Sequence, residues 1–511
     1  MLLALSSKIS QIDRFAEEEL GIPTVTLMSR AGAAIAEAVR TRVPNGARVT
    51  ILAGKGNNGG DGYAAATLLI RDYSVLVYDV LGEGQKNECG KYFLEKYKEA
   101  GGRVEKYEPN SDTEATIKAS DCIVDAIFGT GFSGAMPEVM VTLARTVNET
   151  QGAVKIAVDV PLGVNADTGS VNTTSACTMH ATVVLSFIKP GLVSYPAKSY
   201  VGDIVFDGLG LPLDKISESF DFNYYYLDGA LAESLLPERP ENSNKGSFGK
   251  LLCITGSDKY RGAGKLSVEA ALRGGVGYVT YLGEGVMCDS LFLTLPEAIY
   301  KKCKPIAELS SSDVGDIVEL SAKHSAVLIG SGSGDTEGLR TLVLSLLLAD
   351  GGPLVIDADG INCLCKDREE SLKAIRTSKR TVILTPHPLE FSRLCGDDVT
   401  DIQLHRIESA MKFAAENRCI LVLKGAGTVI TDGKTVYINS SGSSALAKAG
   451  SGDVLAGFLA SMVASGCDPL GAAALSVYYH GLAAESLAKS LSEYGVIPSD
   501  LPCEIARQLS K

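Results

Sequence analysis

The chain has 511 residues and a formal net charge of −13, and a typical domain size of roughly 100–200 residues predicts about two to four domains. Hydrophobic residues make up 45% and charged residues 21%, a globular composition that excludes a mainly disordered chain. The acidic charge disfavours nucleic acid as a partner, whereas loop amides and helix N-termini can still bind a small anion.

The N-terminal apolar run, Leu2 to Leu5, is too short for a signal peptide, and no cation precedes it. No apolar stretch reaches the length of a membrane span. The 12 Cys include no CxxC pair, and no two of the five His stand at metal-ligand spacing. We therefore expect a cytoplasmic protein with reduced thiols that does not enter a membrane.

Short β-branched apolar runs alternate with longer amphipathic segments through most of the chain. Examples of the apolar runs are Arg48–Leu52, Ser74–Tyr78, Asp121–Ala126 and Val154–Val158. This alternation predicts an α/β fold with βαβ units around buried parallel sheets. The alternation lapses between Leu209 and Tyr226 and resumes at Lys250–Thr255. We therefore predict two domains, residues 1–218 and 219–511.

The first glycine-rich loop, GKGNNGGDG, follows a predicted strand and opens a helix predicted over Asp61–Arg71. Gly54, Gly56 and Gly59 fit the dinucleotide fingerprint G-x-G-x-x-G. Asp79 ends the next strand, as a ribose-binding acid does. A dinucleotide dehydrogenase is therefore one interpretation, and a glycine-rich turn without a ligand is another.

Side-chain oxygens accompany these glycines, at Asn57, Asn58 and Asp61. Oxygen ligands suit a hard cation, and backbone amides suit phosphate. Two later predicted strands also end in a carboxylate, Asp125 before the loop IFGTG and Asp159 in DVPLG. Each Asp alone is typical of a helix cap or a turn. Because the carboxyl ends of parallel strands share one edge, we expect the three loops to form one polar crevice.

The motifs NNGGDG, VDAIFGTG and DVP-x-G, with LMSRAG at Leu27–Gly32, resemble the NAD(P)H-hydrate epimerase family over nearly all of residues 1–215. The resemblance implies a Rossmann-like three-layer αβα domain. It implies potassium ligation by Asn58, Asp125 and position 162, where the family usually has Ser and this chain has Leu162, which offers no side-chain oxygen. It also implies that Asp159 is the acid/base at the hydroxylated nicotinamide carbon. The residues that it puts at the hydrated nucleotide are Asn57, Asn58, Gly59, Gly60, Asp61, Gly129, Thr130, Gly131, Phe132, Ser133, Gly134, Ala135 and Asp159.

The strongest motif of the second half is AGSGD at Ala449–Asp453, followed by VLAG. A glycine pair that leads into an apolar helix leaves free N–H groups at the positive end, where a phosphoryl group can bind. Asp453 can take the proton from an attacking hydroxyl group. A capped surface helix would explain Asp453 but not the paired glycines. The segment resembles the anion hole of ribokinase-like enzymes.

Further motifs of the second half are KGSFGK, GSDKYRGA, IGSGSG, DADG, TPHPLE and KGAGT. In DADG, Asp357 and Asp359 suit Mg²⁺ through water, or cap the next turn. Together with AGSGD, the motifs resemble the ADP/ATP-dependent NAD(P)H-hydrate dehydratase family, a ribokinase-like αβα branch, over about residues 225–511. The sequence departs from the family at Ser331, where Pro is preferred, at Leu389, where Gly is preferred, and at Ser443–Leu446.

This second resemblance implies two sets of binding residues. Those at the hydrated nucleotide are Ala263, Gly334, His387 and Asp453. Those at ADP or ATP are Lys424, Gly425, Ala426, Gly427, Thr428, Ser440, Ser441, Gly442, Ser443, Ser444, Ala445, Leu446, Ala447, Lys448 and Gly452.

The two resemblances together imply metabolite repair of hydrated NADH and NADPH. The first domain would epimerise the R and S hydrates with K⁺. The second would phosphorylate the S hydrate from ADP or ATP with Mg²⁺ and then eliminate phosphate. The family also implies a homo-oligomer. Three alternatives stay open: a kinase of a small hydroxymethyl compound in the second half, the dehydrogenase, and a first domain that is a scaffold with a vestigial nucleotide pocket.

Overall fold

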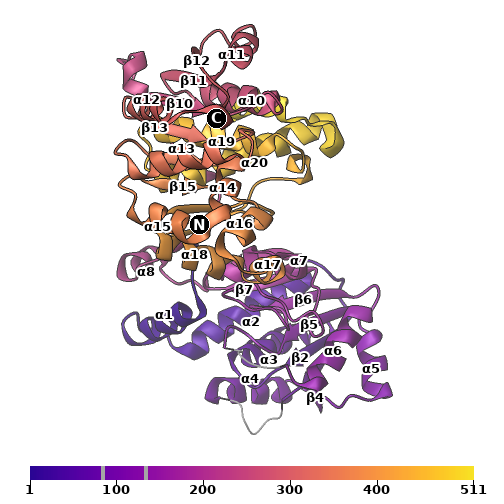
Figure 1. Ribbon diagram of the computed structural model, residues 1–511. Coiled ribbons are helices and arrows are strands. Elements are labelled where there is room, and N and C mark those ends of the chain that lie inside the picture. Colours follow the sequence, from indigo (N-terminus) through magenta and orange to yellow (C-terminus); the bar gives the residue numbers. More distant parts are fainter. Residues whose placement is uncertain (82–86, 132–135, 511) are drawn as a thin grey trace. The chain divides into compact units, whose positions relative to one another are not determined.

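The computed structural model describes residues 1–81, 87–131 and 136–510. The chain forms two compact units, one of residues Leu2–Tyr224 and one of Tyr225–Lys511 that also includes Met1. The division lies in β9 (Tyr224–Leu227), a few residues beyond the boundary that the sequence predicts. In Figure 1 the first unit runs from indigo to magenta, and the second continues through pink and orange to yellow.

The first unit is built on a parallel sheet with strand order β4-β3-β2-β5-β6-β7-β8. Figure 1 shows β2, β5 and β6 at its centre. The strands are β2 (Arg48–Ala53), β3 (Ser74–Asp79), β4 (Arg103–Lys106), β5 (Cys122–Ala126), β6 (Val154–Val158), β7 (Ala181–Leu185) and β8 (Asp203–Asp207). The strand order reverses at β2, so the crevice between the loops after β2 and β5 is the place where such sheets bind ligands.

Helices cover both faces of this sheet because successive strand residues point to opposite sides. Ile51 packs in a cluster with residues of α1, α2, α3 and α4, whereas Leu52 packs with residues of α5 and α6. The helices are α1 (Ser6–Glu18), α2 (Thr24–Arg40), α3 (Asn57–Leu69), α4 (Glu88–Glu99), α5 (Ser111–Lys118), α6 (Glu138–Glu149), α7 (Lys198–Val201) and α8 (Leu213–Ser219), with the short turn η2 (Pro190–Val193) and the N-terminal strand β1 (Leu2–Leu3). This is the predicted three-layer αβα arrangement.

One helix of the first unit begins earlier than the sequence predicts. Helix α3 starts at Asn57 and not at Asp61, with Gly56 in an extended conformation at its N-cap. Asn and Gly are weak helix formers, so the sequence alone favours a longer loop. Tertiary packing overrides this preference, because Gly59 lies directly against the backbone of Gly54. The polar residues Asn57, Asn58 and Asp61 therefore stand on the first turns of a helix.

The second unit has the strand order β9-β18-β17-β16-β15-β14-β13-β10-β11-β12. The strands from β16 to β12 along this order are parallel, and β17 is antiparallel to both β16 and β18. The strands besides β9 are β10 (Lys250–Ile254), β11 (Tyr278–Glu284), β12 (Ile299–Cys303), β13 (Ala326–Ile329), β14 (Leu354–Ile356), β15 (Val382–Leu384), β16 (Ile420–Leu423), β17 (Val429–Thr431) and β18 (Val436–Asn439).

Helices also cover both faces of this sheet, since its central strands are buried on both sides. One face packs against α9, α10, α19, α20 and α21. The helices are α9 (Gly229–Ser234), α10 (Arg261–Arg273), α11 (Gly285–Phe292), α12 (Ser311–Ser321), α13 (Glu337–Leu348), α14 (Asp359–Leu364), α15 (Arg368–Thr377), α16 (Pro388–Cys395), α17 (Val399–Leu404), α18 (Arg406–Asn417), α19 (Ser451–Ala464), α20 (Pro469–Gly495) and α21 (Leu501–Gln508), with short turns η3 (Lys245–Phe248), η4 (Ile306–Glu308), η5 (Cys365–Asp367), η6 (Ser444–Leu446) and η7 (Pro498–Asp500). None of the helices in the described part of the chain is long and apolar enough to cross a membrane.

Gly54 provides a test of how the loops at the strand ends are packed. A Cβ atom at Gly54 would stand 1.9 Å from the carbonyl oxygen of Ile127, so Gly54→Ala must push two backbone segments apart. We expect a loss of about 2–3 kcal/mol of unfolding free energy, measured by urea denaturation. Gly131→Ala is the control, because its Cβ would meet nothing within 4 Å. Equal stability of the two variants would contradict this packing.

Candidate functional sites

A cavity of about 840 Å³ opens in the first unit where the sheet order reverses. It is lined by residues of α1 and α2 and by the loops after β2, β5 and β6. Of the residues implied for the hydrated nucleotide, Asn57, Asn58, Asp61, Gly129, Thr130, Gly131 and Asp159 line it. Gly59 and Gly60 pack behind it, against Gly54 and Met28. Phe132, Ser133, Gly134 and Ala135 lie outside the described residues.

The side-chain amide of Asn58 joins two of these loops. Its Nδ2 donates to the carbonyl oxygen of Phe128 at 2.8 Å and to that of Val158 at 3.0 Å. Two backbone carbonyls therefore converge on the end of this buried side chain. Because the oxygen and nitrogen of an amide can exchange places by a flip, the three groups can present an all-oxygen set to a cation such as K⁺.

Asp125, at the end of β5, is fully buried. Its Oδ1 accepts the N–H of Ile127 at 3.2 Å, and its Oδ2 accepts that of Leu162 at 2.7 Å. Burial raises the pKa of Asp125 to about 6, although these two backbone hydrogen bonds lower it. The backbone of Leu162 thus reaches Asp125, whereas its side chain packs with Ile123, Met140 and neighbouring apolar residues. Leu162 therefore provides no side-chain ligand to a cation.

Asp159, after β6, has a positive φ of 65°, a strained conformation for a non-glycine residue that is frequent at functional sites. Its Oδ1 is hydrogen-bonded to Nζ of Lys189 and accepts the N–H of Leu185 at 3.3 Å. Lys189 is only 1% exposed and also donates to the carbonyl oxygen of Leu185 at 2.9 Å. A buried lysine thus holds this carboxylate.

The sequence analysis missed Lys189 and Asp13, which both line the cavity. Asp13 is on α1, and burial raises its pKa to about 6. Lys189 is the single charge within the apolar run VVLSFIKPG. Such a run predicts a buried strand, and a lysine is rarely buried without a partner, so this position could have been recognised as a candidate ion pair. Asp13 gave no such signal, because it lies on an ordinary amphipathic helix.

The dehydrogenase interpretation receives no support from the geometry of the glycine-rich loop that follows β2. Gly54 and Gly59 pack against the backbones of Ile127 and Gly54, respectively, so backbone packing accounts for these two glycines without a dinucleotide. Asp79 is buried, with 3% of its surface exposed, and is not among the residues that line the cavity.

In the second unit, the AGSGD motif forms the start of α19, as the sequence predicts. Gly450 is the N-cap with a φ of 104°, a conformation that favours glycine. Asp453 lies in the first turn, beside the free N–H groups of that helix end. The pKa of Asp453 is raised to about 7, first by burial and then by the charge of Asp357, although Lys424 lowers it. This carboxyl group can therefore exchange a proton near neutral pH.

Lys424 and Asp357 form a buried ion pair next to this helix end, with Nζ and Oδ1 3.1 Å apart. Asp357 also accepts hydrogen bonds from Thr385 at 2.7 Å and from Ser331 at 2.8 Å. A Cβ at Gly452 would lie 3.4 Å from Nζ of Lys424. The implied nucleotide residues Lys424 and Gly452 are thus brought together, and Asp357 serves to hold Lys424.

The residues implied for the hydrated nucleotide stand on separate elements of this unit. Ala263 is on α10, and the N–H of Gly334 donates to Oδ2 of Asp359 at 2.8 Å. His387 is the N-cap of α16, where its Nδ1 accepts the N–H groups of Leu389 and Glu390 at 3.2 Å. Burial lowers the pKa of His387, and the charge of Lys424 lowers it further. The imidazole is therefore neutral at pH 7.

The segment Ser440–Lys448 is held by two carboxylates that the sequence analysis missed. Oε1 of Glu485 accepts the N–H of Gly442 at 2.7 Å. Oε2 of Glu493 accepts hydrogen bonds from the hydroxyl groups of Ser443 and Ser444 and from the N–H of Ala445. These bonds fix the part of the segment where the sequence departs from the family pattern.

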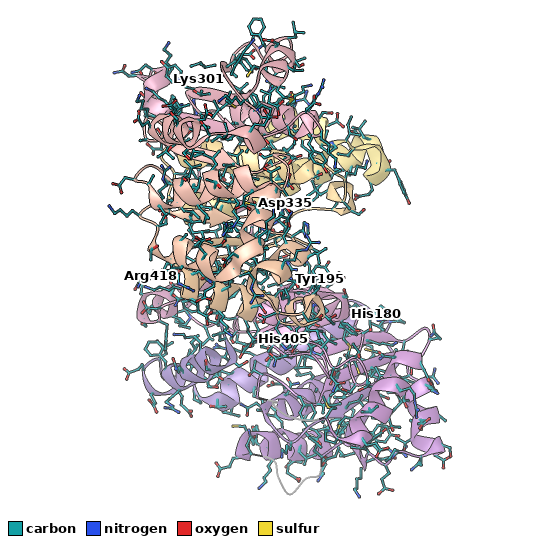
Figure 2. The ribbon with its side chains drawn as sticks, in the orientation of Figure 1. His180, Tyr195, Lys301, Asp335, His405 and Arg418 are labelled. Carbon is teal, nitrogen blue, oxygen red and sulfur yellow. The ribbon has the colours of Figure 1, made fainter. Side chains whose placement is uncertain are left out.

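No group of three or more His, Cys, Asp or Glu side chains that could hold a metal ion occurs among residues 1–81, 87–131 and 136–510. His180, labelled in Figure 2, accepts the N–H of Lys155 at 3.0 Å through Nδ1.

The second unit has a known architecture. It is similar to the crystal structure of a ribokinase-like superfamily protein from Enterococcus faecalis V583, with a TM-score of 0.50 and 24% identity over 57% of this chain and 97% of that chain. At this identity the likeness shows the fold alone. The second unit is therefore a ribokinase-like α/β domain, and the first is a Rossmann-like one.

Sequence comparison identifies the family. Residues 251–508 match the family model described as NAD(P)H-hydrate dehydratase, and residues 24–191 match that of the YjeF-related protein N-terminus. The chain is 34% identical to the bifunctional NAD(P)H-hydrate repair enzyme Nnr of Moorella thermoacetica over 98% of this chain and 95% of that protein. It is 32% identical to the enzyme of the same name from Coxiella burnetii over 98% of both chains. The chain belongs to the family of bifunctional NAD(P)H-hydrate repair enzymes.

Leu162→Ser, which restores the residue that the family usually has, tests what Leu162 does in this chain. Its side chain is fully buried, so we expect the first unit to lose about 2–4 kcal/mol of unfolding free energy, as for other large-to-small core substitutions. Urea denaturation with and without K⁺ measures this loss. A variant as stable as the wild type without K⁺ would show that Leu162 does not contribute to the core.

Proposed function

We propose that the first unit interconverts the R and S hydrates of NADH and NADPH, and that the second uses ADP or ATP to convert the S hydrate back to NADH or NADPH. Family membership supplies the substrate class. The observation that carries the proposal is that each unit has one carboxyl group at a site edge near a lysine: Asp159 is paired with the buried Lys189, and Asp453 feels the charge of the partly exposed Lys424, which is paired with Asp357. Each group can act as a base on a hydroxyl group.

In the second unit, Asp453 takes the proton of the ring hydroxyl, and the hydroxyl oxygen attacks the terminal phosphorus of the nucleotide. The bond from that phosphorus to its bridging oxygen breaks, and AMP leaves where ADP is the donor, or ADP where ATP is the donor. The N–H groups of Gly450 and Gly452 face the charge that develops on the phosphoryl group, whereas that of Ser451 donates to the carbonyl oxygen of Lys448. Lys424 adds a positive charge near Gly452. Phosphate then leaves with the electron pair of the C–O bond, and the neighbouring ring carbon gives its proton to water, which restores the double bond.

Ala263, Gly334 and His387 are proposed to hold the hydrated nucleotide, and Lys424–Thr428 and Ser440–Lys448 the ADP or ATP. Mg²⁺ would come with the nucleotide phosphates and neutralise their charge, since it needs few protein ligands there. Asp359 is the carboxylate proposed to bind it through water, because three hydrogen bonds already occupy Asp357.

In the first unit, Asp159 is proposed as the acid/base, and the cavity residues Asn57, Asn58, Asp61 and Gly129–Gly131 as the nucleotide site. We propose that K⁺ is held by Asn58, Asp125 and the carbonyl oxygens of Phe128 and Val158, with no part for the Leu162 side chain. Bound K⁺ would supply positive charge for the phosphates or the developing oxyanion. The cytoplasmic location and the homo-oligomer stay predictions.

The experiment that tests the proposal follows the recovery of NADH absorbance from a mixture of both hydrates, with Mg²⁺, K⁺ and either ADP or ATP. The wild type should convert the whole mixture faster than the hydrates interconvert spontaneously. Asp159→Asn should stop near the share of the S hydrate, because only the epimerase loses its base. Asp453→Asn should reduce recovery by about 10²- to 10⁴-fold. No recovery by the wild type with either nucleotide would contradict the proposal and favour the small-molecule kinase.

The raised pKa of Asp453 predicts the pH dependence of the dehydratase. The base form is the ionised carboxylate, so kcat/KM for the S hydrate should rise with pH and level off above a pKa of about 7. Asp335→Asn is the control, since Asp335, labelled in Figure 2, is an exposed carboxylate paired with Lys366. Its profile should match that of the wild type. A wild-type profile that is flat from about pH 5 to about pH 9, two units on either side of neutrality, would exclude Asp453 as the base.

A further inference from the structure

The guanidinium group of Arg406 is buried against the loop that follows β16 in the second unit. Only 2% of the surface of Arg406 is exposed. Its Nη2 donates to the carbonyl oxygens of Leu423 at 2.9 Å and Lys424 at 3.2 Å. Its Nη1 donates to Oε1 of Gln403 at 2.6 Å. The guanidinium group therefore lies at the start of the segment Lys424–Thr428.

This buried cation has no carboxylate to balance it. Burial alone lowers the pKa of Arg406 to about 10, because no carboxylate among the described residues lies near enough to raise it. Its Nε is buried without a hydrogen-bond partner there. Arg406 is also the first residue of α18, whose caps His405 and Arg418 are labelled in Figure 2, and the positive end of a helix disfavours a cation. An uncompensated buried charge is strongly destabilising, so the positive charge at this position lowers the stability of the fold.

The backbone of Gly425 separates the guanidinium group from solvent. A Cβ atom on Gly425 would lie 3.0 Å from Nη2 of Arg406 and 3.1 Å from its Nη1. Gly425 is nevertheless exposed, so the guanidinium group lies on one side of it and solvent reaches another. The φ of 144° at this position favours glycine, and Thr428 closes the loop by donating its hydroxyl to the carbonyl oxygen of Gly425 at 2.9 Å. A ligand on the exposed side would meet the field of Arg406 across this thin backbone.

The loop itself presents unpaired donors, whereas its lysine is already balanced. Nζ of Lys424 is 3.1 Å from Oδ1 of Asp357. Within the described part of the chain, no group accepts the N–H groups of Gly425, Ala426 and Gly427. Successive free N–H groups of a loop can bind an anion. An anionic group at this loop would therefore find both hydrogen-bond donors and an unbalanced positive charge.

We propose that Arg406 is a positioning residue for the nucleotide of the second unit, whose charge holds a phosphate group of ADP or ATP on the exposed side of Gly425. This inference rests on the proposed dehydratase function, in which Lys424–Thr428 binds the nucleotide. The phosphate supplies the negative charge that the protein neighbours of Arg406 do not provide. Nucleotide binding thereby offsets the destabilising effect of the buried cation.

The charge of Arg406 and its hydrogen bonds can be tested separately. Arg406→Lys keeps the positive charge, whereas Arg406→Gln keeps hydrogen-bond donors without the charge. Calorimetric titration with ADP and with ATP in Mg²⁺ should show that Kd rises about 10-fold or more in Arg406→Gln and about threefold or less in Arg406→Lys. Turnover of the S hydrate should show the same rise in KM for the nucleotide, with little change in kcat or in KM for the hydrate. An equal loss of affinity in both variants, or no loss in Arg406→Gln, would overturn the inference.

Gln403→Glu tests the charge while Arg406 stays in place. The side chain of Gln403 is exposed, and its Oε1 already accepts Nη1 of Arg406, so the new carboxylate would balance the cation. We expect this variant to unfold at a higher urea concentration than the wild type and yet to bind ADP and ATP about fivefold or more weakly, because the phosphate then meets a neutral pair. A purely structural role of Arg406 would not weaken nucleotide binding while the fold becomes more stable. An unchanged Kd would overturn the inference, even if Arg406→Gln fails to fold.

Arg380→Gln is the matched control. Arg380 is 4% exposed, and its guanidinium group donates to the carbonyl oxygens of Ala349 and Asp350, each at 3.0 Å. It precedes β15, whereas the nucleotide loop follows the parallel strand β16, so the two lie at opposite edges of the sheet. Arg380→Gln should lose stability in urea but keep the wild-type Kd for ADP and ATP. A rise in Kd equal to that of Arg406→Gln would overturn the inference.

Failure of the proposed function and failure of this inference give different results. A wild type that binds neither ADP nor ATP would contradict the proposed dehydratase itself. Normal binding by the wild type, with an unchanged Kd in Arg406→Gln and Gln403→Glu, would overturn only the role of Arg406.

Discussion

A lysine amino group buried beside a carboxylate organises each of the two sites. Lys189 contacts Asp159 in the first unit, and Lys424 contacts Asp357 in the second. Removing two charges from water costs several kcal/mol for each ion, and only good geometry with additional hydrogen bonds offsets this cost. The fold supplies those bonds from strand ends, such as the hydroxyl group of Thr385 on Asp357. The loops at the carboxyl edge of each sheet must therefore stay close to one another, so that the ion pair and its hydrogen bonds keep their geometry.

The same burial leaves other carboxyl groups without a cation of their own. Asp453 and Asp61 consequently have raised pKa values. A carboxyl with a raised pKa in the folded state contributes stability below its unfolded pKa, and this contribution is lost as the pH rises through its folded pKa. For Asp453 that window runs from the ordinary aspartate pKa of 3.8 to about 7. The second unit thus gives up stability over the pH range in which its base becomes active.

Local contacts account for most of the positions at which this chain departs from its family. Ser331, where the family prefers Pro, donates its hydroxyl to Asp357 at 2.8 Å. Leu162, where the family usually has Ser, fills an apolar layer between the sheet and α6. Ser443 lies in the segment held by Glu493. The exposed side chain of Leu389 has no such explanation in the structure.

The sequence by itself determined the α/β class and the glycine-rich loops, and it predicted Asp159 and Asp453 as acid–base residues, because strand periodicity and local motifs are short-range properties. It did not reveal the start of α3 at Asn57, which packing against Gly54 decides. It also did not reveal that Lys189 pairs with Asp159. Lys189 lies 30 residues along the chain from Asp159, and only the folding of β6 and β7 side by side brings the two together. Charge pairing between strand ends depends on tertiary structure, which no local pattern encodes.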